Sequence, residues 1–405
     1  MSDSIKIVTN QGWGSRIGGA IKGVVVGFGL TALSCSVLFW NEGRAVKTAR
    51  ALDEGQGLVV TVQAETVNTA QENKLILTNG EAKAPAPLQE PEFGFSTEAI
   101  GLRREVSHYQ WVESKKSEPQ KKVGGGTETV TTYSYSKDWV REPVNSDAFQ
   151  QPDGHSNSTN VAYKNETYQA KDVQLGAFTL SENLVAGITR DEPLPLTSEM
   201  VSQIPESIRG SAQLDQGGLY YGMAPTSPSV GDVRVTFKKV PYQTVTVLGR
   251  QNGNRIGAYA TSNGLTLESV RAGVLGKEQF FAAEKSDNET MTWILRALGF
   301  AFCFAGISLI LKPLSVVADV IPFLGNLAEM GTSFVSFMLA CMFSFSAMAL
   351  GWFAYRPFLS MTLLGGVAAA VYALRQKRVK LANLKAMMSS PAAGVSEAGA
   401  GQKAA

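Results

Sequence analysis

The sequence predicts an α+β membrane protein: four transmembrane helices carry one large β-rich extramembrane domain, inserted between helix one and helices two to four. Apolar stretches with few or no charges occur once near the N-terminus and three times in the C-terminal third of the 405 residues. Between them the chain alternates apolar and polar residues, as strands do. The formal net charge is only +2, which gives no indication of a nucleic-acid partner.

The first helix is predicted at residues 17–40, after a polar arm at residues 1–16. The eighteen residues from Gly23 to Trp40 carry no charge and would rise about 27 Å as a helix, close to the thickness of the bilayer hydrocarbon. A basic leader precedes this run, so a cleaved signal peptide is the alternative. Bulky and polar residues follow the run instead of small ones, which favours an uncleaved anchor.

The extramembrane α+β domain is predicted at residues 41–290. Its clearest element is a long hairpin of Arg104–Ser114 and Glu128–Val140, with a flexible tip at Gly124-Gly125-Gly126. Helices are expected at Pro195–Arg209 and, leading into the second span, at Gly276–Lys285. Further strands are expected at Leu58–Gln63, at Lys74–Thr78 closed by a turn at Asn79-Gly80, at Val233–Val240, at Thr244–Arg250 and at Ile256–Ala260.

The remaining spans are predicted at residues 291–311, 331–354 and 357–374. Residues 312–330 are too polar to cross, but their apolar residues recur near helical spacing, so we expect an amphipathic loop in the interface. Pro322 should split this loop into two short helices. The loop residues of interest are Pro313, Asp319, Ile321 and Pro322, and the carboxylates of Asp319 and Glu329 are expected to be solvated.

Residues 375–405 form a basic segment followed by a tail rich in Ala, Gly and Ser, which is expected to be disordered. Because cytoplasmic flanks carry an excess of Lys and Arg, the basic segment places the C-terminus in the cytoplasm. Four spans then put both termini on that side and the large domain in a periplasm or lumen.

Glycines recur every fourth residue on helix one. Gly19, Gly23 and Gly27, continued by Thr31, give one helix face without bulk, which favours close approach of another helix. The partner helix could belong to the same chain or to a second copy. A homo-oligomer is therefore one expectation, with membrane lipids as the other immediate partner.

The sequence offers little for catalysis. The only histidines, His108 and His155, stand without metal-ligand spacing and are expected to be structural. No phosphate-binding or nucleophile-elbow motif is present, so no catalytic, metal or cofactor residue is predicted. Arg296 is expected to reach the headgroups from a span end, and the third span offers only hydroxyls, among them Ser336 and Ser344.

Taken together, several motifs resemble the LUMA family of four-span membrane proteins, over nearly the whole chain. The segments that carry the resemblance are Asn41–Val46, Leu102–Val106, Tyr109–Glu113, Tyr133–Tyr135 with Trp139, Gly154-His155 with Asn157, Val230–Val235 with Phe237, Leu295–Ala297, Ile321-Pro322, Gly351–Phe353 and Tyr355–Pro357.

The resemblance implies a lumenal domain, self-association and a role in organising membrane-protein assemblies. The location would be the inner nuclear membrane or endoplasmic reticulum for a eukaryotic member, with emerin and lamins as partners, or the inner membrane for a bacterial one. A non-enzymatic, homo-oligomeric membrane scaffold is thus the leading hypothesis. An oligomeric ion channel or transporter is the alternative, and a lipid-modifying enzyme, which rests on the interfacial loop, is the third.

Overall fold

The structure is a computed structural model that describes residues 3–158, 162–210, 212–358, 360–362 and 375–376. Three of its helices are long and apolar enough to cross a membrane: α1 (Trp13–Leu58), α5 (Lys277–Ala318) and α6, which runs from Pro322 to Tyr355. The expectation of four spans is therefore not supported. The predicted fourth span, residues 357–374, lies mostly outside the described residues, as does nearly all of the tail at 375–405.

Helix α1 is much longer than predicted. Its 46 residues rise about 69 Å, more than twice the hydrocarbon thickness. The extension beyond residue 40 is held by tertiary packing, since Ala51 and Leu52 are buried with Leu75 of the sheet and Phe280 of α5. Helix α5 starts where the sequence predicts, just after Gly276. It has 42 residues, so it too is longer than one membrane crossing requires.

The predicted loop at residues 312–330 is mostly a continuation of the two long helices. Helix α5 runs through Pro313 to Ala318, and α6 starts at Pro322. Proline fits this position because the first turn of a helix needs no backbone donor and its fixed φ is already helical. The prediction that Pro322 divides the segment is thus confirmed, whereas the two short interfacial helices are replaced by the ends of α5 and α6.

The larger sheet has eight strands and is built around the long hairpin. Strands β6 (Gly101–Lys121) and β7 (Thr127–Val140) pair antiparallel over their full facing length, which confirms the predicted hairpin and extends it. The path order is β1-β7-β6-β14-β13-β12, with β11 on β14 and β8 on β6. The other strands are β1 (Ser4–Gln11), β8 (Glu166–Gln169), β11 (Glu192–Leu194), β12 (Gln213–Asp215), β13 (Gly218–Tyr221) and β14 (Val233–Val240).

The predicted polar arm at residues 1–16 is in fact largely strand β1. The sequence carries only Ile5 and Ile7 as an alternating signal there, and those side chains are half-buried. The strand forms because the outer edge of β7 offers unpaired backbone groups along the whole of its facing length. Long-range pairing of this kind leaves little trace in local sequence.

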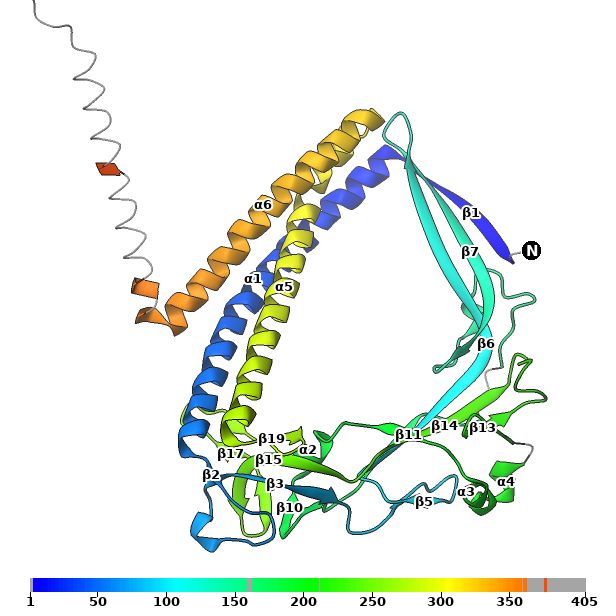
Figure 1. Ribbon diagram of the computed structural model, residues 1–405. Coiled ribbons are helices and arrows are strands. Elements are labelled where there is room, and N and C mark those ends of the chain that lie inside the picture. The colour runs from blue at the N-terminus through cyan, green and yellow to red at the C-terminus, as the bar shows by residue number, and fades with distance from the viewer. Residues whose placement is uncertain (1–2, 159–161, 211, 359, 363–374, 377–405) are drawn as a thin grey trace, which may run out of the picture.

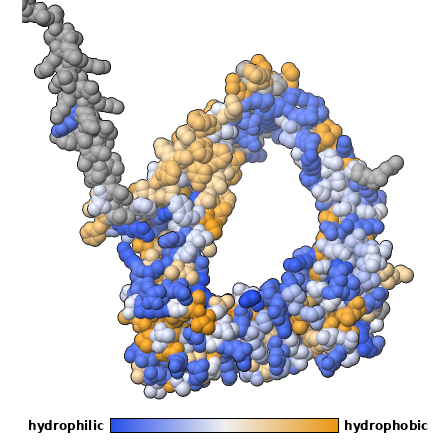
Figure 2. Space-filling view, viewed as in Figure 1, coloured by the Kyte–Doolittle hydropathy of each residue, from blue (hydrophilic) through white to orange (hydrophobic). Residues whose placement is uncertain are grey.

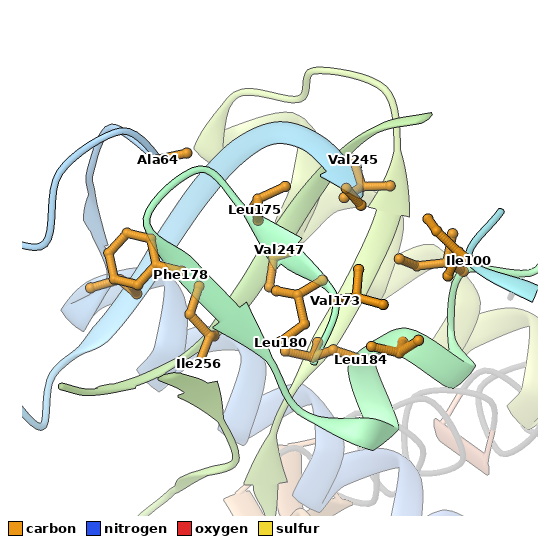
Figure 3. Packing of buried hydrophobic residues seen from close by; sticks show 14 residues of the cluster. Ala64, Ile100, Val173, Leu175, Phe178, Leu180, Leu184, Val245, Val247 and Ile256 are labelled. Atoms are coloured by element: carbon orange, nitrogen blue, oxygen red, sulfur yellow. The ribbon is translucent and has the colours of Figure 1, made fainter. Parts of the chain in front are cut away.

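The second sheet has seven strands in the order β19-β15-β16-β10-β9-β3-β2 and holds the main core. Figure 3 shows Val247 of β15 between Leu175 and Leu180, with Phe178 and Ile256 at one side of the same cluster. The predicted turn at Asn79-Gly80 is wrong, because β3 continues through both residues to Lys83. The strands are β2 (Val60–Thr61), β3 (Leu75–Lys83), β9 (Gln174–Leu175), β10 (Phe178–Leu180), β15 (Gln243–Asn252), β16 (Arg255–Gly257) and β19 (Ser269–Ala272).

Small elements complete the domain. The segment predicted as one helix at Pro195–Arg209 contains two short ones, separated at Pro205. The remaining elements are α2 (Glu182–Ala186), α3 (Ser198–Gln203), α4 (Glu206–Arg209), the 3-10 turns Thr69–Gln71 and Ser146–Ala148, and the two-stranded sheets β4 (Leu88–Gln89) with β5 (Ser96–Thr97) and β17 (Tyr259–Ala260) with β18 (Thr266–Leu267).

The elements close into a ring. In Figure 1 the three long helices form one wall, the sheets form the base, and the β6–β7 hairpin with β1 forms the opposite wall, whose tip returns to the upper helix ends. The space-filling view shows an opening through the middle of the molecule (Figure 2). The wall of helices is largely apolar in its upper half, and the hairpin wall is largely polar.

Candidate functional site

The three long helices meet at a buried ionic contact. Glu42 of α1 accepts hydrogen bonds from Arg296 of α5, Nε to Oε1 at 2.7 Å and Nη2 to Oε2 at 2.8 Å, and from the indole Nε1 of Trp352 on α6 at 2.8 Å. The Glu42 side chain is only 3% exposed. A two-pronged guanidinium–carboxylate pair has fixed geometry, so this contact sets the relative positions of all three helices.

Glycines let the helices come close enough for this contact. A Cβ at Gly351 would lie 2.8 Å from the Cβ of Glu42, and one at Gly43 would lie 2.5 Å from the ring of Tyr355. Neither neighbour is the free end of a flexible chain, so any side chain at these positions would push α6 away from α1. The backbone of Tyr355 also accepts a hydrogen bond from Arg50 at 3.0 Å.

A second set of polar side chains continues the contact toward the domain. Arg44 donates to Asn288 Oδ1 at 3.0 Å and to Thr292 Oγ1 at 2.9 Å, and the buried Asn41 donates to the Thr292 carbonyl at 3.1 Å. Together with Glu42, Arg296 and Trp352 we name these residues the helix-junction network. A cavity of about 330 Å³ adjoins the network, and its lining also includes Asp53, Lys285 and Arg356.

A second polar cluster lies at the far end of the same helices, where the hairpin tip docks. Asp319, with a side chain 2% exposed, forms ion pairs with Arg16 and with Lys121, whose Nζ lies 2.9 Å from Oδ1. Lys121 also pairs with Glu329 at 2.7 Å. Partial burial opposes the charge on Lys121, but hydrogen bonds to Glu329 and Asp319 outweigh it and raise the pKa of this ammonium.

Backbone contacts complete this docking. The amide of Gly124 at the hairpin tip donates to the Val320 carbonyl at 3.0 Å, and the indole of Trp13 donates to the Val316 carbonyl at 2.9 Å. Gly125 has φ +78°, and a Cβ there would strike the Trp13 ring. We name Arg16, Lys121, Asp319, Glu329 and these partners the tip latch. The expectation that Asp319 is solvated is wrong, because Arg16 and Lys121 cover it.

Of the residues predicted for helix association, Gly27 and Thr31 lie at a close interface within the chain. A Cβ at Gly27 would lie 2.5 Å from the Gly306 carbonyl oxygen of α5, and a Cβ at Gly306 would meet Thr31 Oγ1 at the same distance. Gly23 faces Leu309 of α5 more loosely, and no atom of the described residues outside its own helix lies within 4 Å of a Cβ built at Gly19. The face therefore packs α1 on α5, and its role between copies stays a prediction.

The four loop residues separate in the structure. Pro313 lies inside α5, Asp319 caps that helix and joins the tip latch, Ile321 is exposed at the start of α6, and Pro322 occupies the first turn of α6. On α6 the hydroxyl-bearing Ser336 and Ser344 are buried, on the same face as Ala340, which packs on Cys303 and Ile307 of α5. These hydroxyls therefore lie at a helix contact.

Other motif residues stabilise the domain. Arg104 forms a buried ion pair with Glu90 at 2.7 Å and lies over the Phe93 ring. His155 stacks on Tyr135 and its Nε2 lies 2.7 Å from Asp3 Oδ2, so its structural role is confirmed. Within the described residues, no group of three or more His, Cys, Asp or Glu side chains could hold a metal ion.

Sequence reasoning missed the helix-junction network. Arg296 was assigned to the lipid headgroups, whereas the structure pairs it with Glu42, 254 positions away in the chain. The available signal was the motif resemblance itself. Asn41–Val46, Leu295–Ala297 and Gly351–Phe353 lie on three different helices and converge on this one contact. Tyr355, the first residue of the motif Tyr355–Pro357, ends α6 and packs on Gly43 beside it.

Comparison with known proteins gives a consistent result. The family model described as transmembrane protein 43 matches residues 108–357. Transmembrane protein 43 from Rattus norvegicus is 33% identical over 95% of this chain and 97% of its own length, and the Homo sapiens protein is 31% identical over 94% and 96%. The homologue from Drosophila melanogaster is 28% identical over 81% and 87%.

No solved structure gives a significant match. The relatives nevertheless cover this chain almost from end to end, so the long helices and the domain belong together in one family architecture. The chain is a member of the transmembrane protein 43 family, also called LUMA, and is an integral membrane protein.

Proposed function

We propose that the protein is a self-associating membrane scaffold that organises other membrane proteins and does no covalent chemistry. The observation that supports this proposal is that buried polar contacts stabilise the ring at two separate places along its three long helices. The helix-junction network fixes α1, α5 and α6 to one another, and the tip latch fixes the hairpin to their far ends. The buried ion pairs of the helices, Glu42 with Arg296 and Asp319 with Arg16 and Lys121, thus stabilise the arrangement of the ring.

The proposal also rests on the surface that the braced helices present. Helix α6 exposes large apolar side chains around most of its circumference, including Phe334, Phe345 and Phe353, and α1 exposes Val25 and Phe28. Such a surface is stable only against lipid or against other apolar helices. A rigid frame with this surface and a broad polar domain is suited to hold neighbouring membrane proteins at fixed positions.

Self-association can be tested by the size of the protein in mild detergent and in lipid nanodiscs. We expect an assembly larger than one chain in both. A strict monomer in both media would refute the scaffold as proposed.

Two variants separate self-association from folding. Gly19→Leu changes the part of the glycine face that contacts none of the described residues, so it should reduce the assembly while the protomer keeps its melting temperature. Gly27→Leu strikes the Gly306 backbone, so it should destabilise the protomer itself. Unchanged assembly in Gly19→Leu would exclude this end of the face as the contact between copies.

A further inference from the structure

We propose that the cavity beside the helix-junction network binds the headgroup of phosphatidylethanolamine, a zwitterionic phospholipid, at the membrane surface that faces the β-rich domain. In this site Arg356 binds the phosphate and Glu289 binds the primary ammonium. The inference assigns a ligand to the protein, and it does not depend on the scaffold role.

The cavity lies at the level where the uncharged parts of the three long helices end. In α1 the uncharged run stops at Trp40, just before Glu42, in α5 it starts after Arg296, and in α6 it stops at Tyr355. Charged side chains are excluded from the hydrocarbon and frequent at its boundary. The helix-junction network therefore marks the boundary of the bilayer hydrocarbon on the side of the domain.

Tryptophans mark the same level. Trp40, Trp293 and Trp352 belong to three different helices, and all three stand next to the contact between Glu42 and Arg296. Trp40 is 57% exposed and Trp293 is 66% exposed. Tryptophan is enriched at the membrane–water interface because its ring is apolar and its N–H is polar. Since Trp293 and Trp352 line the cavity, it opens at headgroup level.

The size of the cavity suits a headgroup. Small side chains, Ala45 and Ala49, lie one turn apart on the face of α1 that lines it, which leaves space between α1 and α5. Its volume of about 330 Å³ is at the low end of small-molecule sites, about 300–1,000 Å³. The site therefore accommodates the polar part of a lipid, and the acyl chains lie along the exposed apolar surface of the helices.

Among the described residues that line the cavity, one cation and one anion have no ion-pair partner. Four of the charged side chains form two ion pairs: Arg296 with Glu42 and Lys285 with Asp53. Arg356 and Glu289 are left, and both are exposed. A ligand that carries one negative and one positive group complements these two side chains, and the headgroup of phosphatidylethanolamine has that composition.

The two charges also follow the order of the groups in the lipid. Arg356 comes directly after the uncharged run of α6, whereas Glu289 lies seven residues before Arg296 on α5, about 10 Å farther toward the domain along the helix axis. A phospholipid likewise has its phosphate nearer the acyl chains and its ammonium farther out. Guanidinium suits the phosphate because its planar fork donates two parallel hydrogen bonds to phosphate oxygens.

The outer end of the cavity favours a primary over a quaternary ammonium. Glu289 and Trp293 are four residues apart on α5, so they share one helix face. A primary ammonium donates hydrogen bonds that the Glu289 carboxylate accepts. Quaternary ammonium is typically bound in a cage of several aromatic rings, and Trp293 is the one aromatic ring beside Glu289 among the described lining residues.

Native mass spectrometry of the detergent-purified protein tests the site. The probes are phosphatidylethanolamine and phosphatidylglycerol with the same acyl chains, added at equal concentrations. The wild type should bind phosphatidylethanolamine several-fold more. Glu289→Gln should lose this preference, Arg356→Gln should bind both lipids more weakly, and Arg356→Lys, which keeps the charge, should bind both better than Arg356→Gln.

Matched controls change exposed charges outside the cavity: Glu278→Gln in the first turn of α5 and Arg250→Gln on β15. Both should bind lipid as the wild type does. Melting temperatures without lipid show whether each variant is folded, and if Arg356→Gln melts lower, Glu289→Gln alone decides. Equal binding of the two lipids by the wild type, or an unchanged preference in a folded Glu289→Gln, would overturn the proposal.

A soluble analogue distinguishes a lipid from a free headgroup. The probe is glycerophosphoethanolamine, which carries the same charges without acyl chains. Phosphatidylethanolamine should raise the melting temperature of the wild type, and the analogue at the same concentration should raise it much less. An equal rise with the analogue would refute the assignment to a membrane lipid.

Discussion

Replacing Glu42 by Gln should destabilise the helical wall. The substitution keeps the size of the side chain and one oxygen that can accept from Trp352, but it removes the charge opposite Arg296. The Arg296 side chain is 17% exposed, so it would stay mostly buried without a counter-charge. Breaking a buried pair in this way costs about 3–5 kcal/mol, and the residual exposure of Arg296 favours the lower end, about 3 kcal/mol.

The measurement is the apparent melting temperature in one detergent at one scan rate, since a membrane protein of this size is not expected to unfold reversibly. A loss of about 3 kcal/mol should lower the melting temperature by roughly 3–5 °C. Glu289→Gln is the matched control, because Glu289 is exposed at the neighbouring cavity. It should change the stability by no more than about 0.5 kcal/mol.

A double variant sharpens the reasoning. Glu42→Gln combined with Arg296→Met removes the unpaired charge as well, so it should be more stable than Glu42→Gln alone. If Glu42→Gln melted together with the wild type and the control, or if the double variant lost the sum of both single losses, the ion pair would not be what holds the three helices in place.

Three further predictions concern other parts of the ring. Asp319→Asn should weaken the tip latch by about 1–3 kcal/mol, because Arg16 and Lys121 lose their shared carboxylate. The variant should therefore be cleaved faster by a protease at the hairpin tip Gly124–Gly126. Glu329→Gln, which changes a more exposed partner of Lys121, should have a smaller effect. Equal cleavage rates would argue against the latch. Gly351→Leu should lower the melting temperature at least as much as Glu42→Gln, since its side chain would strike Glu42, whereas Gly331→Leu, with open space at its Cβ, should not. Burial of Tyr220, together with its hydrogen bond to Asp232, raises the pKa of the phenol to about 12, so the native state keeps the proton that the unfolded chain loses near pH 10. The stability from this tyrosine is present below pH 10 and is lost as pH rises toward 12. Tyr220→Phe should flatten that decline in a melting series, and an unchanged slope would contradict the assignment.

The parts of the fold that the sequence predicted are those with a strong local signal. The uncharged run from Gly23 to Trp40 and the alternation in Arg104–Ser114 and Glu128–Val140 each carry their own period, so α1 and the β6–β7 hairpin could be placed before any contact was known. The same is true of the start of α5 after Gly276. The predicted ends of elements were wrong where tertiary packing extends the element, as in the extension of α1 to Leu58 and the continuation of β3 through Asn79-Gly80.

Sequence by itself determined that this is a membrane protein with long apolar helices and an inserted β-rich domain, because hydropathy and period are properties of short windows. Only the tertiary structure decided which charged side chains pair with one another. Glu42 with Arg296 and Asp319 with Arg16 are pairs separated by 254 and 303 positions, and strand β1 finds its partner more than a hundred residues away. Such contacts depend on which surfaces the whole chain brings together, and no window of sequence contains that information.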